Sequence, residues 1–193
     1  MTLPLPDFAA ARRAMIDSQL RPEGVTDTAV LAVMASVPRE DFVPEALRPL
    51  AYSDRPLDLG NGDTLMAPAA FAKLLTELQP RRGERALVIG SANGYAARVL
   101  EELGLNVHVA GATGGDTKGK YDLILIDGAV EEVPERIIAQ MAPQARLGTA
   151  VADDGVTRLA VGRVAGGSLG FRRFADADVP LLPGFTRPRA FTF

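Results

Sequence analysis

The fold is decided by the stretch ERALVIGSANGY, residues 84–95. A short apolar run over residues 86–89 ends at Gly90, and an amphipathic helical pattern begins after Gly94. A buried strand, a tight glycine turn and a helix start are the usual opening of a nucleotide-binding α/β unit. Glycine lets the backbone approach a ligand closely, and the first N–H groups of a helix are free to bind it. A purely structural turn would have the same pattern, because Ala92 stands where the middle glycine of a G-x-G-x-G turn would be.

The composition excludes several kinds of site. The 193 residues include no Cys and one His, so Cys-based zinc sites, thiol nucleophiles and multi-His metal sites are not expected. The formal net charge of −3 provides no basic field for nucleic acid. No apolar run approaches the roughly 20 residues that a membrane span needs, and the N-terminus lacks a signal-peptide pattern. We therefore expect a cytoplasmic protein without metal, nucleic-acid or membrane partners.

The first 80 residues are predicted to form an N-terminal helical subdomain. Apolar residues recur at helical spacing over residues 8–20, and Thr26-Asp27 is a typical start for a second helix that ends at Val37-Pro38. A third short helical piece is predicted over residues 40–47, followed by a loop over 48–63. A helix entered through Pro68 is then predicted over residues 64–78.

Residues 81–193 alternate between strand and helix patterns. After the strand and helix of the glycine turn, a short strand is predicted at 107–109 and a fully apolar, buried strand at 121–127. A helix at 134–141, a strand at 147–151 and a hairpin of residues 156–164 and 171–174 follow. This order predicts a shortened three-layer, Rossmann-like α/β domain with a mostly parallel sheet and an antiparallel C-terminal edge. His108 alternates with apolar Val107 and Val109, so it is predicted to be structural or at the surface.

Several motifs in the same order resemble the protein-L-isoaspartate O-methyltransferase family over roughly residues 8–152. They are GVTD at 24–27, VPREDFVP at 37–44, AYSDRPLDLGNGDTLMAP at 51–68, YDLILID at 121–127 and MAPQARL at 141–147. The resemblance implies an S-adenosylmethionine-dependent methyltransferase that acts in protein repair. Such enzymes methylate the α-carboxyl group of isoaspartyl residues in proteins or peptides, and the ester then collapses to a succinimide that can reopen to aspartate.

The resemblance also implies a set of site residues. Gly90, Gly94 and Asp116 would form the cofactor site, with Asp116 near the adenine amino group, while Thr64 and Asp127 would face the methyl acceptor. Asp127 ends the predicted buried strand, at the edge of the sheet where ligands bind in open α/β folds. It could equally cap the following turn, and Asp116 could be a solvated loop residue. Tyr52 and Asp54 would border the substrate cleft, or serve as a packed aromatic and a turn acid.

Some positions depart from the family pattern where chemistry would occur. Met66 replaces a serine and cannot donate a hydrogen bond to a carboxylate. Val88 replaces an acidic residue that would accept from the ammonium group of the cofactor, and Gln144-Ala145 replaces a pair of glycines. The alternative function is therefore a catalytically inactive family member that acts as a binding or scaffold protein. The enzyme hypothesis predicts an open cleft, floored by glycines, at Gly90–Gly94 beside Thr64. The scaffold hypothesis predicts that Met66, Ala92 or the 110–119 loop fills this cleft.

The spacing between the glycine turn and the buried strand is short. Residues 91 to 121 separate Gly90 from Asp122, and a βαβ unit needs about 30 residues, so one such unit fits and two do not. If GGDTKG at 114–119 corresponds to the Gly-Asp-Gly loop of the family, residues 107–109 are the third strand and the second is missing. Otherwise residues 107–109 are the second strand and the third is missing. The sequence leaves open whether the natural protein also lacks this segment.

Overall fold

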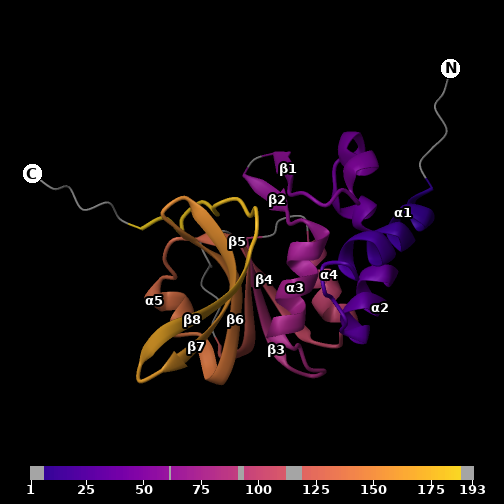
Figure 1. The fold of residues 1–193 in the computed structure, drawn as a ribbon. Helices are drawn as coiled ribbons and strands as arrows, with labels where there is room; N and C mark the ends of the chain where they lie inside the picture. Colours follow the sequence, from indigo (N-terminus) through magenta and orange to yellow (C-terminus); the bar gives the residue numbers. More distant parts are fainter. Residues whose placement is uncertain (1–6, 61, 91–93, 112–118, 188–193) are drawn as a thin grey trace, which may run out of the picture.

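The structure, a computed structural model, describes residues 7–60, 62–90, 94–111 and 119–187 (Figure 1). Its main sheet has the order β4-β3-β5-β6-β7-β8. The strands are β3 (Arg85–Ile89), β4 (Asn106–Ala110), β5 (Tyr121–Val130), β6 (Met141–Asp153), β7 (Val156–Ala165) and β8 (Ser168–Asp176). The first four strands of this order are parallel, and β7 and β8 are antiparallel. This confirms the predicted mixed α/β sheet with its antiparallel C-terminal edge.

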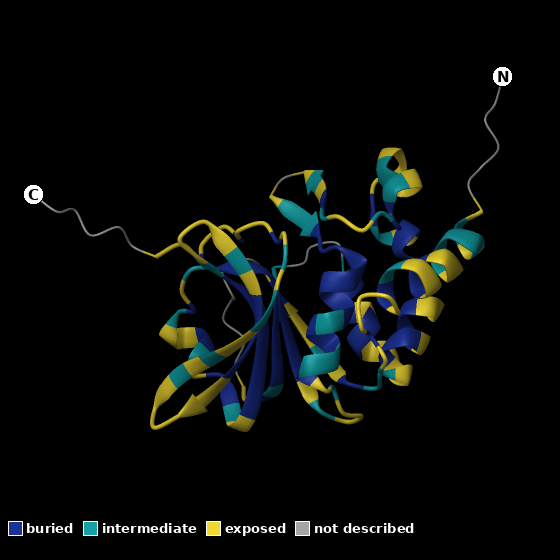
Figure 2. Ribbon diagram, in the orientation of Figure 1, coloured by how far each residue is buried: buried dark blue, intermediate teal, exposed yellow. Residues whose placement is uncertain are grey.

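The central strands are buried on both faces, as their continuous apolar sequence predicts. Val88 and Leu125 point to the face covered by the helices α3 (Pro68–Leu78) and α4 (Tyr95–Glu102), whereas Leu87 and Ile124 point to the other face. The short helix α5 (Glu135–Ile138) connects β5 to β6 on that second face (Figure 1). Figure 2 shows the strands at the centre of the molecule as an almost continuous buried layer.

Before α3 the chain is mostly helical, as predicted. The helix α1 (Phe8–Met15) continues into a π-helical turn, η1 (Ile16–Leu20), and α2 (Thr28–Ser36) follows. The Asp27 carboxylate caps α2 by accepting hydrogen bonds from the backbone N–H groups of Ala29 and Val30 at 2.9 and 3.0 Å. Two 3₁₀ turns, η2 (Arg39–Phe42) and η3 (Glu45–Leu50), take the place of the single third helix.

The loop predicted over residues 48–63 contains a strand, and this part of the prediction was wrong. The strand β1 (Leu57–Gly60) pairs antiparallel with β2 (Asp63–Leu65), so α3 begins at Pro68 rather than at residue 64. The glycines near the turn hid the short hairpin, which has one buried residue on each strand, Leu57 and Leu65. Likewise α5 is shorter than predicted, because Met141 already pairs with Tyr121 as the first residue of β6.

The strand at 107–109 lies directly beside the glycine strand. In β4, Val109 is paired with Val88 of β3 in a parallel register. Within the described ranges no strand lies beyond β4. The Nδ1 atom of His108 in β4 is 3.0 Å from the hydroxyl of Tyr121 at the start of β5, a contact that fits the predicted structural role. None of the helices in the described part of the chain is long and apolar enough to cross a bilayer.

Candidate functional site

The site lies at the carboxyl ends of β3 and β5. The chain leaves β3 for β4 on one side and returns to β5 on the other, which makes the crevice between these two ends a topological switch point. Pairing between β3 and β5 ends at Ile89 and Ile126. Gly90 and Asp127 are therefore the first residues beyond the paired ladder, and the structure brings these two predicted site residues to the same crevice.

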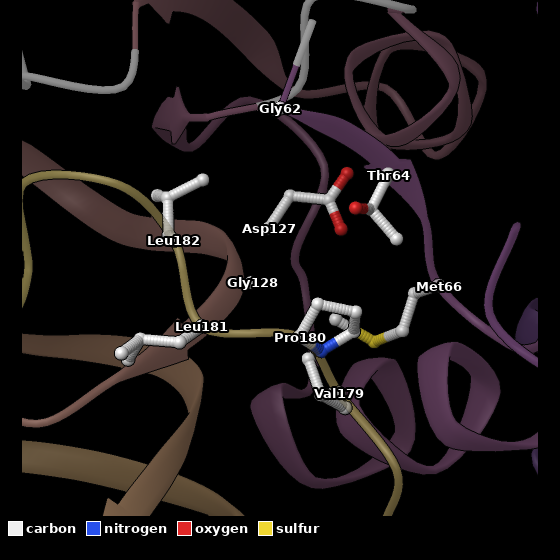
Figure 3. Close-up of a pocket in the computed structure, with 9 residues that line it drawn as sticks. All are labelled: Gly62, Thr64, Met66, Asp127, Gly128, Val179, Pro180, Leu181 and Leu182. Atoms are coloured by element: carbon white, nitrogen blue, oxygen red, sulfur yellow. The ribbon is translucent and has the colours of Figure 1, made fainter. Parts of the chain in front are cut away.

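Thr64 comes to the crevice from the β1–β2 hairpin. Figure 3 shows the carboxylate of Asp127, which is 6% exposed, pointing toward the side chain of Thr64. The two residues line one pocket together with Gly62, Met66, Gly128, Val179, Pro180, Leu181 and Leu182. Its water-accessible volume is about 10 Å³, room for about one water molecule. The two residues predicted to face the methyl acceptor thus lie together in a small, mainly apolar pocket.

The wall of this pocket opposite Thr64 is a C-terminal segment that the sequence analysis did not identify. Backbone hydrogen bonds attach it to β5: Ala129 N–H donates to Pro180 O and Leu182 N–H donates to Ala129 O, both at 2.8 Å. Glu131 N–H donates to Phe185 O at 2.9 Å. The apolar residues among the prolines after β8 were the available signal, but nothing in their spacing indicated that they return to β5.

The two predicted cofactor glycines have different surroundings. Gly94 has a φ of +80° as the N-cap of α4, and a Cβ atom added there would meet nothing within 4 Å. Gly90 has a φ of +99°, and an added Cβ would lie 2.6 Å from Cδ2 of Leu182. Both conformations favour glycine. A side chain at Gly94 would therefore meet no described atom with its first carbon, whereas Leu182 packs against Gly90.

The remaining predicted positions are divided between the pocket, the core and the undescribed segments. Met66 lines the pocket of Thr64 and Asp127, and Val88 is completely buried in β3. Asp116 and Ala92 lie outside the described residues, as does most of the 110–119 loop. Asp54 accepts a hydrogen bond from the backbone N–H of Ala69 at 3.2 Å, so it caps the first turn of α3.

A buried arginine behind the pocket was missed from the sequence. Arg39 is 0% exposed, and its Nε and Nη2 atoms donate to the carbonyl oxygens of Ala51 and Met66, both at 2.8 Å. Its Cζ atom lies 4.7 Å from the ring centroid of Tyr95, the first residue of α4. Arg39 therefore connects the N-terminal helical region to the pocket wall at Met66 and to the start of α4.

Tyr52 fixes the 3₁₀ turn that carries Arg39. Its hydroxyl donates to Glu40, and it accepts from Nε of Arg12 at 2.7 Å and from the backbone N–H of Arg39 at 3.3 Å. Arg12 also forms an ion pair with Glu40 at 2.8 Å. Burial, followed by the hydrogen bond with Glu40, raises the pKa of Tyr52 to about 12. Of the two roles left open, the structure therefore gives Tyr52 that of a packed aromatic with a satisfied hydroxyl.

Tyr95 is a buried residue whose pKa is affected by the charges around the site. Its ring packs against Phe42 and Phe71, with centroid distances of 5.4 and 5.5 Å. Burial raises its pKa above the ordinary value; the Arg39 cation opposes this rise and the Asp127 carboxylate adds to it. Arg39 and Asp127 therefore act in opposite directions on the pKa of the buried phenol of Tyr95.

Comparisons with known proteins agree on one family. The family model described as "Protein-L-isoaspartate(D-aspartate) O-methyltransferase (PCMT)" matches residues 10–107. The chain is 37% identical to a protein-L-isoaspartate O-methyltransferase of Methylorubrum extorquens (strain PA1), over 75% of each protein. It is 34% identical to a protein-L-isoaspartate O-methyltransferase 2 of Marinobacter nauticus, over 91% of this chain and 94% of the relative.

A solved structure shares the fold. The crystal structure of a protein from Plasmodium falciparum superposes on this chain with a TM-score of 0.74 at 19% identity. That protein is described as a protein-L-isoaspartate O-methyltransferase in complex with S-adenosyl-L-homocysteine. The superposition covers 90% of this chain and 98% of the other. The order of strands, the motifs before α3 and these similarities lead to one conclusion: the chain belongs to the protein-L-isoaspartate O-methyltransferase family.

Proposed function

We propose that this chain is a protein-L-isoaspartate O-methyltransferase, which transfers the methyl group of S-adenosylmethionine to isoaspartyl carboxyl groups in proteins or peptides. The observation that supports it best is the meeting of Thr64 and Asp127 at the switch point beside Gly90, in a chain of this family. The relatives named above support the substrate, and the solved relative with S-adenosylhomocysteine supports the cofactor.

The residues at the start of α4 fit one end of the cofactor. A Cβ atom added at Gly94, the N-cap of α4, would meet no described atom, and the backbone N–H groups of the first turn would hold the carboxylate of the methionine part. Gly90 would lie under the same part, next to Leu182, and Asp116 remains our proposal for the adenine amino group. When bound, S-adenosylmethionine supplies an electrophilic methyl group on its sulfonium.

The residues of the pocket would handle the acceptor. The hydroxyl of Thr64 would donate a hydrogen bond to the acceptor and hold it in place. Met66, Val179 and Leu182 would exclude water, which strengthens polar interactions inside the pocket. We assign Asp127, which lines the same pocket, to the acceptor side as well.

The alternative is a family member that binds a partner without catalysis. Two observations favour it: Leu182 packs against Gly90, and the pocket has room for about one water molecule. An active enzyme needs the C-terminal segment or the β1–β2 hairpin to shift so that a peptide can reach Thr64.

Calorimetric titration with S-adenosylhomocysteine distinguishes the two functions. We expect a dissociation constant in the micromolar range, followed by methyl transfer to an isoaspartyl peptide and none to the same peptide with normal aspartate. Replacing Thr64 by Val should lower kcat/KM by about tenfold or more, since one hydrogen bond to a charged group is lost. Absence of binding up to millimolar ligand, by a protein shown to be folded, would support the non-catalytic alternative.

A further inference from the structure

Arg39 holds a buried positive charge with an incomplete set of partners. It is 0% exposed, and no carboxylate of the described residues forms an ion pair with it. Its Nε and Nη2 atoms donate to the carbonyl oxygens of Ala51 and Met66, whereas Nη1 makes no hydrogen bond to the described part of the chain. A buried cation without a carboxylate partner destabilises a fold, so stability alone does not explain this arrangement.

The neighbouring charges leave this positive charge in place. Arg12 and Glu40 form an ion pair at 2.8 Å, so their charges neutralise each other. The hydroxyl of Tyr52 donates to Glu40 and accepts from the backbone N–H of Arg39, which joins the pair to Arg39 without changing the net charge. The cluster of Arg12, Glu40, Tyr52 and Arg39 therefore carries, as a whole, the charge of Arg39.

Arg39 lies directly behind the wall of the pocket of Thr64 and Asp127. Met66, whose carbonyl oxygen accepts from Arg39 at 2.8 Å, is one of the residues that line this pocket. Arg39 lowers the pKa of the buried Tyr95 and Asp127 raises it, so both charges act on the same buried group. Charges in such a poorly solvated region are screened less than charges at the surface.

A negatively charged acceptor in this pocket would be stabilised by the charge behind the wall. The α-carboxyl group of an isoaspartyl residue is ionised at neutral pH, since such groups have pKa values of about 3.3–3.7. In the pocket it lies beside the carboxylate of Asp127, and two carboxylates in one site disfavour each other's ionised forms. The buried cation of Arg39 offsets this repulsion, because opposite charges attract more strongly there than in water.

We propose that Arg39 is a positioning residue for the acceptor, whose charge makes the pocket of Thr64 and Asp127 prefer an ionised carboxylate over a neutral group of the same shape. This inference rests on the proposed function, because it assumes that the pocket receives the acceptor. Arg39 acts from behind Met66, without touching the acceptor. A residue with only a structural role would affect charged and neutral acceptors alike.

Two peptides that differ only in charge at the acceptor measure this preference. One carries an isoaspartyl residue with a free α-carboxylate, and the other carries the same residue as its α-carboxamide. Titrated at neutral pH into the wild-type protein, with and without S-adenosylhomocysteine, the carboxylate peptide should bind about tenfold more tightly. In Arg39→Met the ratio of the two affinities should fall to about one, and KM for the carboxylate peptide should rise more than kcat falls. Arg39→Lys keeps the charge and should restore most of the ratio.

A second variant changes the charge of the cluster without altering Arg39. Glu40→Gln removes the negative charge that neutralises Arg12, so the preference for the carboxylate peptide should rise by about two- to threefold. It decides the matter even if Arg39→Met does not fold. Arg55→Met is the matched control, because it removes one positive charge from an exposed residue outside the cluster and should leave the ratio unchanged.

Equal affinity of the wild-type protein for the two peptides overturns the inference, and so does failure of both to bind at millimolar concentration. A ratio that keeps its wild-type value in Arg39→Met or in Glu40→Gln also overturns it. If Arg39→Met weakens binding of S-adenosylhomocysteine and not the preference between the peptides, the charge serves the carboxylate of the cofactor and the inference is wrong. Absence of methyl transfer, with a ratio that follows the charge of Arg39, would reject the proposed function and keep the charge preference of the pocket.

Discussion

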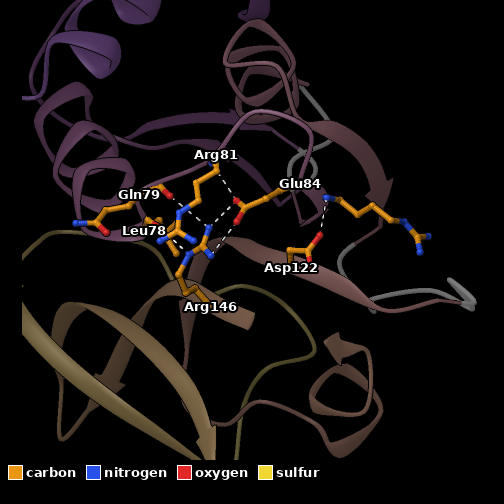
Figure 4. Close-up of polar contacts among 7 residues, drawn as sticks. Leu78, Gln79, Arg81, Glu84, Asp122 and Arg146 are labelled. Atoms are coloured by element: carbon orange, nitrogen blue, oxygen red, sulfur yellow. Dashed lines mark hydrogen bonds and ion pairs between the residues drawn. The ribbon is translucent and has the colours of Figure 1, made fainter. Parts of the chain in front are cut away.

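At the amino ends of the parallel strands, Arg146 and Glu84 form a buried ion pair, whereas at the carboxyl ends Asp127 faces a pocket. The guanidinium of Arg146 binds both carboxylate oxygens of Glu84, at 2.6 and 3.0 Å, and also the carbonyls of Leu78 and Gln79 (Figure 4). Glu84 in turn accepts from the backbone N–H of Arg81 at 2.9 Å. The ion pair at the amino ends thus joins α3, β3 and β6, while the carboxylate of Asp127 lines a pocket at the carboxyl ends.

The two ends of the sheet therefore differ in the role of their charged side chains: stability at the amino ends and a pocket for a ligand at the carboxyl ends. A bidentate arginine–carboxylate pair that also binds backbone carbonyls is costly to break and provides no group for a ligand. A carboxylate that lines a pocket at a topological switch point lies where a bound ligand can contact it. Variants at the two ends should therefore separate stability from binding.

The largest effect is expected from breaking the pair at the amino ends. Replacing Arg146 by Met leaves Glu84, whose side chain is only 14% exposed, without its cation, so the free energy of unfolding should fall by about 3 kcal/mol. Denaturant unfolding measures this change, and binding of S-adenosylhomocysteine per folded molecule should remain as in the wild type. Glu102→Gln is the control, since its pair with Arg98 is half-exposed on α4 and should contribute about 0.3–0.5 kcal/mol. Similar losses in both variants would mean that burial does not distinguish the two pairs.

The next effect concerns the glycines at the carboxyl ends. Gly90→Ala forces a side chain into a φ of +99° and toward Leu182, so we expect a loss of about 1–3 kcal/mol in unfolding free energy. Gly94→Ala has similar backbone strain without the contact, and the difference between the two variants measures the packing of Leu182 on Gly90. If Leu182→Ala, combined with Gly90→Ala, recovers none of that difference, the close contact does not exist in solution.

A smaller effect is expected in the network that supports the carboxyl-end site from behind. Tyr52→Phe removes the hydroxyl that binds Arg12, Glu40 and the backbone of Arg39, and should cost about 1–2 kcal/mol. The folded-state pKa of Tyr52 is raised from 10.0 to about 12, so its contribution is complete below pH 10 and is lost as pH rises through about 12. Unfolding measured from pH 9 to 11.5 should therefore show the two proteins converging at high pH. A constant difference between them would contradict the role of this hydroxyl.

The smallest effect is expected at the amino ends, and its sign is opposite. Gln144 has a φ of +65°, in the left-handed region that favours glycine. Gln144→Gly relieves the left-handed strain but adds freedom to the unfolded chain, so a net gain of about 0.5 kcal/mol is expected. Thermal unfolding detects such a gain as a small rise in Tm, and a fall in Tm would show that the glutamine side chain contributes packing that offsets its strain.

Much of the fold follows from local patterns. The apolar strand β5, the start of α4 after Gly94 and the hairpin of β7 and β8 were all predicted, because strand and helix periodicity shows in consecutive residues. The N-cap of α2 at Asp27 was predicted for the same reason. The hairpin of β1 and β2 was missed, since three or four residues are too few for a period-2 pattern to emerge.

The family, the order of strands and helices, and the placement of Gly90 and Asp127 at strand ends could be predicted from the sequence. Each of these features depends on residues that are close together in the chain. Three contacts became visible in the tertiary structure: Thr64 with Asp127, Arg39 with the ring of Tyr95, and Leu182 with Gly90. These contacts join segments that are 56 to 92 residues apart, and such pairings leave no periodic signal in the sequence. They form because closing the core buries apolar surface from all these segments at once, and the polar groups carried along must then find partners or face the pocket.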